Sequence, residues 1–443
     1  MATSTLALQK PKDISLDEIE AELRNIWRSQ DGGSMAPVAT RATTFTMVIY
    51  EPEEFQQLLA TLGFYSGAID GSHGPETREA ILDAQKKYDL RMTGRVGPKT
   101  LKKLREEVRS LPPSQQHYNN IDIRGFNFDG GLAAQNPCRV ITLCPVFGDD
   151  EGVSAQVSAY CPVQNSGSSN LVCCEYITIK GTKEALERVA AVVNSLVVSD
   201  LPKFVWWKAT PNPEQVLFDK IALNSSCLIL DSSYYSDAES EIVKIQALVN
   251  ERTNIADLNW YRLAPWQELA AAAFDPPERR MDIGEVDRIG IDYEKGNPAQ
   301  ALMMLGWLAS RLDWQPKTYS NEGGDYDLKR ICFTGEGGRE IEAELAAIPV
   351  ANQGEVLGDL TGVRLESTNP QANCNTILCS ETAGCMRMES GGSAQSSLVE
   401  EVTSLSDQRS DLLLEQQLQS WGEDVLFEES LAVTSEILGL VNR

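Results

Sequence analysis

Residues 171–209 read LVCCEYITIKGTKEALERVAAVVNSLVVSDLPKFVWWKA and contain a strand pattern, a helix pattern and a second strand pattern in succession. LVCCEYITI (171–179) and KFVWWKA (203–209) are rich in β-branched, aromatic and other apolar residues, as buried strands are. TKEALERVAAVVNSLV (182–197) between them reads as a helix. Strands that alternate with helices predict a layered α/β domain.

The alternation continues on both sides of this stretch. Further strands are predicted at RVITLCPV (139–146), VSAQVSAYCPV (153–163) and SCLILD (226–231), and a further helix at PEQVLFDKIAL (213–223). A second set of elements follows: a helical stretch (238–274), the strand VDRIGIDYE (286–294), the helix PAQALMMLGWLASRLDW (298–314) and strands to residue 365. We therefore expect a two-lobed α/β body, with a second lobe of the α/β or α+β class.

The two ends of the chain carry helix and strand signals of their own. Residues 15–28 predict an amphipathic helix, in which Ser15 and Glu18 have capping-box spacing. TTFTMVIY (43–50) predicts a strand. In the tail, Val402, Leu405 and Leu412 fall at helical spacing, and a second helical run ends near residue 440. We expect this tail to lie on the body; a free partner-binding helix is the alternative.

Composition narrows the classes of function. Among 443 residues, 39 are Lys or Arg and 64 are Asp or Glu, so the formal net charge is −25. Phosphate backbones and anionic membrane surfaces repel such a chain, so neither nucleic acid nor a membrane is an expected partner. The N-terminus lacks the apolar run of a signal peptide, and no window is long and apolar enough to span a bilayer. We expect a cytoplasmic protein whose ten cysteines are mostly reduced.

Few residues suit catalysis. His73 and His117 are the only histidines, and neither a Walker-type phosphate loop nor a GxGxxG motif after a strand is present. We predict no catalytic site, no metal and no cofactor. Trp206 and Trp207 are adjacent on a predicted strand, so one ring could face the core while the other contacts a partner. The alternative is two core positions in a sheet that is covered on both sides.

The stretch CNTILCSETAGC (374–385) places three cysteines in twelve residues. A zinc site would need four ligands, and the C-x4-C-x5-C spacing offers neither a CxxC pair nor a nearby histidine. Either adjacent pair could close a disulfide, although SETAG between Cys379 and Cys385 bends more readily than NTIL between Cys374 and Cys379. Three inert thiols are the other alternative. We interpret the remaining seven cysteines as inert: Cys138, Cys144, Cys161, Cys173, Cys174, Cys227 and Cys332.

Residues 51–109 resemble a small three-helix peptidoglycan-binding domain. Ala84 departs from the pattern, because the family usually has an aromatic residue before the glutamine. Without an export signal, this copy is expected to meet no cell wall and to act as a rigid insertion or an extra contact surface. The matching residues are Gly63, Tyr65, Gly67, Asp70, Gly71, Gly74, Thr77, Ala80, Gln85, Leu90, Thr93, Gly94, Thr100 and Leu101.

The remainder resembles the glucose-6-phosphate dehydrogenase assembly protein family (OpcA), in its cyanobacterial form. The resemblance lies in ATTFTMVIY, NPCRVITL, DLPKFVWWKATPNP, SCLILDSS, DLNWYRLAPWQELAAAAFDP and ALMMLGWLASRLDW. It divides the chain into an N-terminal helix and strand (1–50), the inserted module (51–109), an N-terminal α/β domain (119–237), a C-terminal domain (238–390) and a helical tail (396–443).

The resemblance to this family implies a function that the residues alone do not name. It implies a non-catalytic partner that binds and activates glucose-6-phosphate dehydrogenase in the oxidative pentose phosphate pathway. It also implies a thioredoxin-responsive disulfide at C-x5-C spacing, which matches Cys379 and Cys385. The alternatives are a peptidoglycan-binding or hydrolase-associated protein, and a small-molecule-binding α/β protein.

Overall fold

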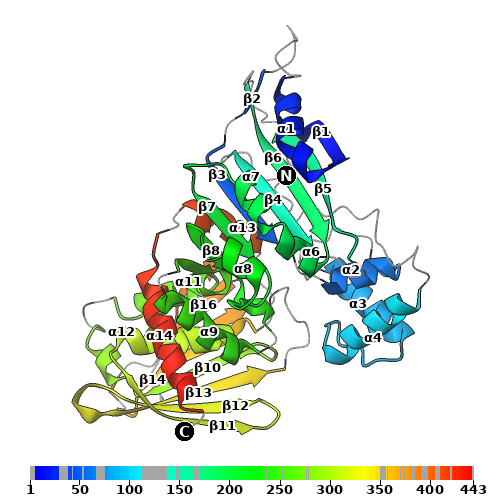
Figure 1. Ribbon diagram of the computed structural model, residues 1–443. Coiled ribbons are helices and arrows are strands. Elements are labelled where there is room, and N and C mark those ends of the chain that lie inside the picture. The colour runs from blue at the N-terminus through cyan, green and yellow to red at the C-terminus, as the bar shows by residue number, and fades with distance from the viewer. Residues whose placement is uncertain are drawn as a thin grey trace. The chain divides into compact units, whose positions relative to one another are not determined.

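The structure of the 443-residue chain is a computed structural model, and it falls into two compact units, Met1–Ile229 and Leu230–Arg443 (Figure 1). Each unit contains one large sheet and its own helices. The predicted α/β class with two lobes is therefore confirmed. The structure describes residues 5–28, 38–41, 43–51, 54–65, 75–111, 137–145, 150–162, 170–235, 237–251, 253–275, 277, 279–349, 356, 358–369, 371–372, 375–380, 385–390, 398–404, 410–419 and 422–441.

The sheet of the first unit has a parallel centre, in the order β6-β4-β3-β7-β8. β5 and then β1 extend it with antiparallel pairing, and β2 pairs with the start of β6. β3, β7 and β8 are buried along their whole length, as expected for parallel strands covered on both faces. The strands are β1 (Thr5–Ile14), β2 (Val38–Arg41), β3 (Phe45–Tyr50), β4 (Cys138–Pro145), β5 (Val153–Pro162), β6 (Asn170–Gly181), β7 (Lys203–Trp207) and β8 (Cys227–Leu230).

The helices of the first unit lie within the segments where the sequence predicts them, although α8 begins three residues later than predicted. Ser15 and Glu18 form the expected capping box, after which the 3-10 turn η1 (Leu16–Glu18) leads into α1 (Ile19–Arg28). The helix predicted over 182–197 is two helices, α6 (Lys183–Arg188) and α7 (Ala190–Leu196), because Val189 leaves the helical conformation. Thr182 caps α6 by accepting a hydrogen bond from the Ala185 amide at 3.2 Å. α8 (Val216–Ile221) precedes β8.

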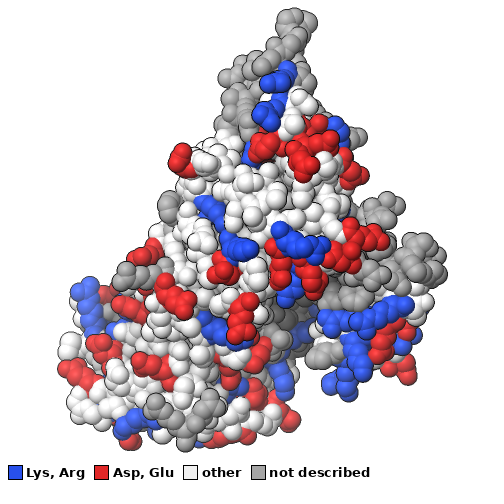
Figure 2. All heavy atoms as spheres, viewed as in Figure 1, with Lys and Arg blue, Asp and Glu red and all other residues white. Residues whose placement is uncertain are grey.

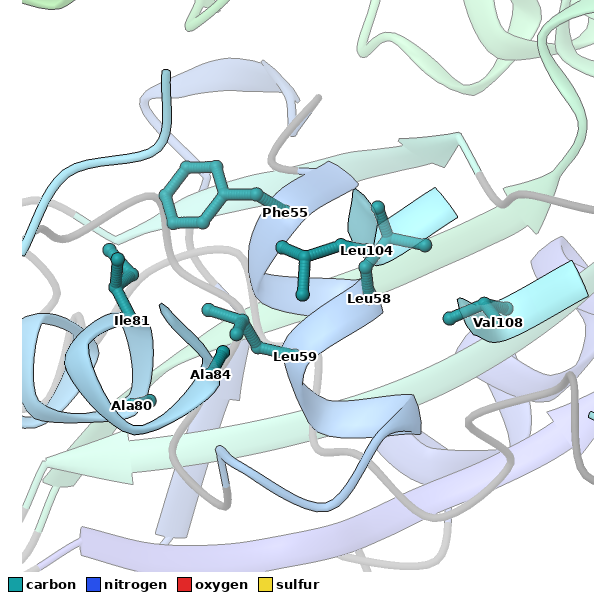
Figure 3. Packing of buried hydrophobic residues seen from close by; sticks show 8 residues of the cluster. All are labelled: Phe55, Leu58, Leu59, Ala80, Ile81, Ala84, Leu104 and Val108. Carbon is teal, nitrogen blue, oxygen red and sulfur yellow. The ribbon is translucent and has the colours of Figure 1, made fainter. Parts of the chain in front are cut away.

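The helical module lies between β3 and β4 in the chain. Its helices are α2 (Glu54–Thr61), α3 (Pro75–Lys87) and α4 (Pro98–Ser110), and they enclose a small core (Figure 3). Ala84, the position that departs from the family pattern, is fully buried in this core. The core consists of Phe55, Leu58, Leu59, Ala80, Ile81, Ala84, Leu104 and Val108.

Gln85, on α3, joins α4 to the loop that precedes α4. Its side-chain amide donates to Thr93 Oγ1 at 3.0 Å and to Thr100 Oγ1 at 3.2 Å, and its oxygen accepts from the Gly94 amide at 3.1 Å. Gly94 has φ +67°, a conformation that favours glycine. This hydrogen-bond centre explains why the glutamine, the threonines and the glycine occur together in the sequence pattern. Gln57 of α2 donates to the Pro145 carbonyl at the end of β4, 2.9 Å away.

The second unit has an eight-stranded sheet in the order β11-β12-β13-β10-β14-β15-β16-β17. Only β10 and β13 pair in parallel; the other neighbours are antiparallel. The strands are β10 (Arg288–Glu294), β11 (Gln315–Gly323), β12 (Leu328–Thr334), β13 (Glu340–Ile348), β14 (Leu360–Glu366), β15 (Asn375–Ser380), β16 (Cys385–Ser390) and β17 (Leu398–Ser404). The other elements are η3 (Ser232–Tyr234), α9 (Ala238–Asn250), β9 (Ile255–Asp257), α10 (Leu258–Tyr261), α11 (Ala264–Ala272), η4 (Asp282–Glu285), α12 (Ala299–Arg311), η5 (Glu336–Gly338), α13 (Ser410–Gln419) and α14 (Val425–Gly439).

The C-terminal helix α14 packs closely against α12. Ser430 Oγ donates to the Met303 carbonyl at 2.7 Å, and Thr434 Oγ1 donates to the Leu302 carbonyl at 3.2 Å. The close approach requires Gly306, since a Cβ there would lie 2.5 Å from the Ser430 carbonyl oxygen. α14 is therefore an integral part of the second unit.

Two local predictions were wrong. Residues 398–404 form strand β17 rather than a helix, because pairing with β16 outweighs the helical spacing of the tail. The helical stretch predicted at 238–274 is interrupted by the short strand β9.

Candidate functional site

A buried ion pair lies at the carboxyl ends of β3 and β7. Glu51 follows β3, Lys208 follows β7, and Lys208 Nζ is 2.5 Å from Glu51 Oε2. The side chain of Glu51 is fully buried and that of Lys208 is 6% exposed. The Glu51 amide also donates to the Leu143 carbonyl of β4 at 2.9 Å, so the pair connects three parallel strands.

This pair occupies the topological switch point of the first sheet. The chain crosses from β3 towards β4 on one side, and β7 lies on the other side of β3. In doubly wound folds, ligands bind in the crevice at this point, where a glycine-rich turn approaches the phosphates. Here the segment after β3 begins with Glu51, whose buried carboxylate engages the Lys208 ammonium, so that ammonium is not available to a phosphate. The arrangement suits joining strand ends better than holding a nucleotide.

Trp206 and Trp207 are both buried, with 3% and 0% exposure. Trp207 stacks on Tyr50 of β3, with ring centroids 3.9 Å apart, and meets Phe218 of α8 edge-on at 4.9 Å. Lys208 Nζ lies 4.3 Å from the centroid of the Trp206 ring. Neither ring offers an exposed surface in this structure, so a contact of either with a partner would first require its uncovering. That contact stays a prediction.

A second polar cluster lies at the end of β8 and belongs to the second unit. Arg262 donates to both oxygens of Asp231, at 2.7 and 2.9 Å, and both side chains are at most 2% exposed. Ser410, the first residue of α13, donates to Asp231 Oδ2 at 2.9 Å. Burial by itself would raise the pKa of Asp231, but the charge and hydrogen bonds of Arg262 hold it below its usual value. The pair anchors α13 to the centre of the unit.

Asp257 extends this cluster. Its Oδ1 accepts from the amides of Ser232 and Asn259, at 3.0 and 2.9 Å, which caps α10. Burial, and then the negative charge of Asp231, raises the pKa of Asp257 to about 6. Gln300 of α12 donates to Asn259 Oδ1 at 2.9 Å. η3, α10, α12 and α13 of the second unit are thus joined by one buried hydrogen-bond network.

A third cluster holds the N-terminal helix on the first sheet. Arg139 of β4 donates to Glu175 of β6 at 2.8 Å and to Glu20 of α1 at 2.7 Å. Trp27 of α1 donates its ring N–H to Glu175 at 2.7 Å. The α1 helix is therefore fixed by charge as well as by its buried residues Ile19 and Leu23.

Cys379 and Cys385 lie on neighbouring strands of the second sheet. In the ladder of β15 and β16, Cys379 pairs with Met386, and Ser380 pairs with Cys385. The two cysteines are thus offset by one residue. Their side chains lie outside what the structure describes, as does all of Cys374, so the proposed disulfide stays a prediction.

The other cysteines are not all inert. Cys173 is disulfide-bonded, which corrects its interpretation as an inert thiol, and its partner's side chain is outside the described part. Cys138 and Cys174 are free and buried, with their sulfurs 4.0 Å apart. Cys144 and Cys227 are also free and buried.

The sequence did not reveal the charged clusters as sites. Asp231, Asp257 and Arg262 lie in the family motifs SCLILDSS and DLNWYRLAPW, but no functional role was predicted for them. The position of Asp231 directly after a buried strand could have indicated a site, because charged residues at the carboxyl ends of parallel strands meet at the same edge of the sheet. Among the described residues, no group of three or more His, Cys, Asp or Glu could hold a metal ion. His73 and His117 lie outside those residues.

Within the described part of the chain, none of the helices has both the length and the apolar character that a bilayer span needs.

Both units match family models of one class of protein, whose description reads "Glucose-6-phosphate dehydrogenase subunit". The model of its N-terminal domain matches residues 130–247, and the model of its C-terminal domain matches residues 253–431. A third model, "Putative peptidoglycan binding domain", matches residues 51–104.

The chain belongs to the OpcA family. It is 53% identical to the "Putative OxPP cycle protein OpcA" of Nostoc punctiforme, covering 100% of this chain and 97% of that protein. It is also 53% identical to the protein of the same name from Synechococcus elongatus, covering 99% of this chain and 98% of the relative. The resemblance seen in the sequence is therefore confirmed, including the module within it.

Solved structures add little. The 3-ketoreductase KijD10 from Actinomadura kijaniata, in an open conformation with NADP, is 12% identical, with a TM-score of 0.39 over 59% of this chain and 81% of the reductase. A likeness of this size carries no argument about activity.

Proposed function

We propose that this protein has no catalytic activity of its own and activates glucose-6-phosphate dehydrogenase by binding it, which promotes the oxidative pentose phosphate pathway. The observation that carries the proposal is the family match, which extends over both units. The ion pair of Glu51 and Lys208 supports the non-catalytic part, because it fills the position where a doubly wound sheet would hold its ligand. The cytoplasm is the compartment in which we place this activity.

Activation by binding has a definite kinetic form. A partner that stabilises the binding-competent state of an enzyme improves the apparent affinity for substrate in proportion to the population of that state. We therefore expect the apparent KM for glucose-6-phosphate to fall when the purified protein is added to the dehydrogenase. Unchanged dehydrogenase kinetics with both the oxidised and the reduced protein would contradict the proposal. A substrate-dependent activity of the protein alone would contradict its non-catalytic part.

We further propose that a disulfide between Cys379 and Cys385 regulates this activation, with the oxidised form the better activator and thioredoxin as the reductant. The one-residue offset of the two cysteines in the ladder indicates how oxidation would change the hairpin. Successive residues of a strand alternate between faces, so joining these positions requires the last pair, Ser380 with Cys385, to open. Oxidation would then shorten the hairpin of β15 and β16, and reduction would let it pair fully.

The match to a peptidoglycan-binding model favours one other candidate function, the binding of cell-wall fragments by residues 51–104. It differs from the first proposal in its ligand, and a binding assay with purified peptidoglycan separates the two.

A further inference from the structure

The end of the helical module carries a charge opposite to that of the chain. Residues 75–111 contain ten Lys and Arg against six Asp and Glu, whereas the whole chain has 39 against 64. In the space-filling view, Lys and Arg side chains gather over the part of the module that contains α3 and α4 (Figure 2). An isolated positive region on an acidic protein creates a local field that attracts acidic groups.

Several of these basic side chains have no carboxylate partner among the residues that the structure describes. Lys86, Lys87, Arg91 and Lys99 are exposed, and none of them forms an ion pair with any residue in the described ranges. This is notable in a chain with so many acidic residues. Elsewhere in the molecule, exposed cations such as Arg188 do pair with a carboxylate, at 2.6 Å from Asp150.

Two lysines of the module lie against one aromatic ring, and a third shares a helix face with one of them. Lys87 Nζ, from α3, lies 5.7 Å from the centroid of the Tyr88 ring, and Lys103 Nζ, from α4, lies 5.5 Å from it. Lys87 Nζ is also 5.0 Å from the centroid of the Phe64 ring. Lys99 precedes Lys103 by four residues, so both lie on the same face of α4. We call Lys87, Tyr88, Lys99 and Lys103 the basic face.

One pair within the basic face, Lys99 with Lys103, works against the stability of the module. Like charges four residues apart on a helix destabilise it, by about 0.2–0.5 kcal/mol per pair. Lys103 is compensated by Glu107 at 2.6 Å, but Lys87 and Lys99 are not compensated within the described residues. The hydrophobic core of the module uses none of these charges. Lys87 can add some stability, because it lies in the last turn of α3 and over two aromatic rings, whereas the charge of Lys99 adds none; recognition of a partner would give a use to both.

We propose that the basic face is a docking surface for a carboxylate-rich surface of the dehydrogenase. This inference rests on the proposed function, because it takes the dehydrogenase as the partner. Ammonium groups held over aromatic rings recognise carboxylates through charge and stay oriented by the ring. A positive face on a protein with a net charge of −25 also favours one direction of approach, because it attracts an acidic partner that the acidic parts of the surface repel. The module then orients the complex.

The test compares two charge reversals of equal size. One variant carries Lys87→Glu and Lys99→Glu; the matched control carries Lys183→Glu and Lys220→Glu, which are exposed lysines on α6 and α8. The Kd for the dehydrogenase is measured for both at low and at high NaCl concentration. We expect the first variant to bind at least about tenfold more weakly at low salt, with a difference that shrinks at high salt, and the control to bind within about twofold of wild type.

The possible outcomes are distinct. Lys99→Glu removes a like-charge pair from α4, whereas Lys87→Glu removes a favourable charge from the last turn of α3, so we expect the Tm of the first variant to change little. If the reversal impairs folding, Lys87→Gln with Lys99→Gln replaces it and should give a smaller loss of affinity. Equal Kd values for both charge-reversal variants would overturn the docking surface, even if the face then proved to bind peptidoglycan or nucleic acid. If the wild-type protein neither binds nor activates the dehydrogenase, the proposed function itself fails.

Discussion

Asp257 is fully buried beside Asp231, and two backbone amides donate to one of its oxygens while no described residue donates to the other. Arg262 compensates Asp231 with two hydrogen bonds. In this cluster the charge of Asp231 is therefore stabilised, whereas the charge of Asp257 destabilises the folded state. The Glu51–Lys208 pair in the first unit follows the first pattern. Such buried charges position strand ends and helix starts, but each must be fully paired to avoid destabilising the fold.

The raised pKa of Asp257 gives the protein a specific pH response. Its folded pKa, about 6, lies above the ordinary 3.8, so the folded state binds the proton more tightly. The contribution of this group to stability is therefore present below pH 3.8 and is lost as the pH rises to 6, by about 3 kcal/mol. Asp257→Asn should remove this loss, so we expect its Tm to exceed that of wild type at pH 8 and to match it at pH 4.

Thermal unfolding at both pH values checks this expectation. Asp219→Asn, at an exposed position of α8, serves as the control and should shift the Tm by a similar small amount at both pH values. A Tm of Asp257→Asn that stays equally far from the wild-type value at both pH values would show that the carboxylate is not the titrating group.

Helix α14 illustrates how one element depends on a single small residue of another. A side chain at Gly306 of α12 would meet the Ser430 carbonyl oxygen at 2.5 Å, and a backbone oxygen cannot rotate away. We expect Gly306→Ala to destabilise the second unit by about 1–3 kcal/mol, through displacement of α14. Hydrogen exchange of the α14 amides, together with urea unfolding, measures the effect.

The chain offers a matched control for this substitution. Gly439, at the end of α14, has no atom within 4 Å of a built Cβ, so Gly439→Ala should be neutral or slightly stabilising. Equal stability of the two alanine variants would mean that α14 does not depend on the close approach to α12.

The hairpin of β15 and β16 is the element on which redox control depends. We expect Cys379→Ser and Cys385→Ser each to abolish the redox dependence of dehydrogenase activation and to keep the protein in the weaker activating state. Cys374→Ser is the control and should respond as wild type does. The measurement is activation titrated against a dithiol/disulfide buffer, with a midpoint that must lie near that of thioredoxin for reduction to occur.

The result of this titration also tests the pairing of the cysteines. Loss of the response in Cys374→Ser, with the response of Cys385→Ser retained, would assign the disulfide to the other pair. A response that persists in all three variants would place the switch elsewhere. The disulfide of Cys173, on β6 of the first unit, would then be the first alternative to examine.

The protein as a whole combines two lobes of one family with a module from another, inserted at the crossover from β3 to β4. Crossovers between parallel strands tolerate long insertions, because lengthening a loop costs little free energy. The module has its own core and its own hydrogen-bond centre at Gln85. It could therefore be added without any change to the sheet that carries it.

We expect the inserted module to have lost cell-wall binding. The intact protein should not co-sediment with purified peptidoglycan at concentrations where it binds the dehydrogenase. The readout is the fraction of protein in the pellet. It is compared with that of a sample without peptidoglycan and with that of a known peptidoglycan-binding protein. Co-sedimentation that disappears on substitution of residues 70–74 would contradict this expectation.

Local chemistry in the sequence by itself determined most of the elements and the class of the fold. The capping box of Ser15 and Glu18, the buried run FTMVIY and the helix of residues 299–311 could be predicted because each depends on side chains close together in the chain. Motifs within the sequence also indicated the family and the inserted module.

Only the tertiary structure decided which distant residues meet. Asp231 and Arg262 are 31 positions apart and Arg262 and Ser410 are 148, so no local pattern links them. Residues 398–404 form a strand because the edge of β16 was available for pairing. Lys87 and Lys103 meet at the Tyr88 ring only after α3 and α4 have packed together. Hydrophobic periodicity determines which face of an element is buried, whereas contacts between elements depend on register and packing, which arise when the whole chain folds.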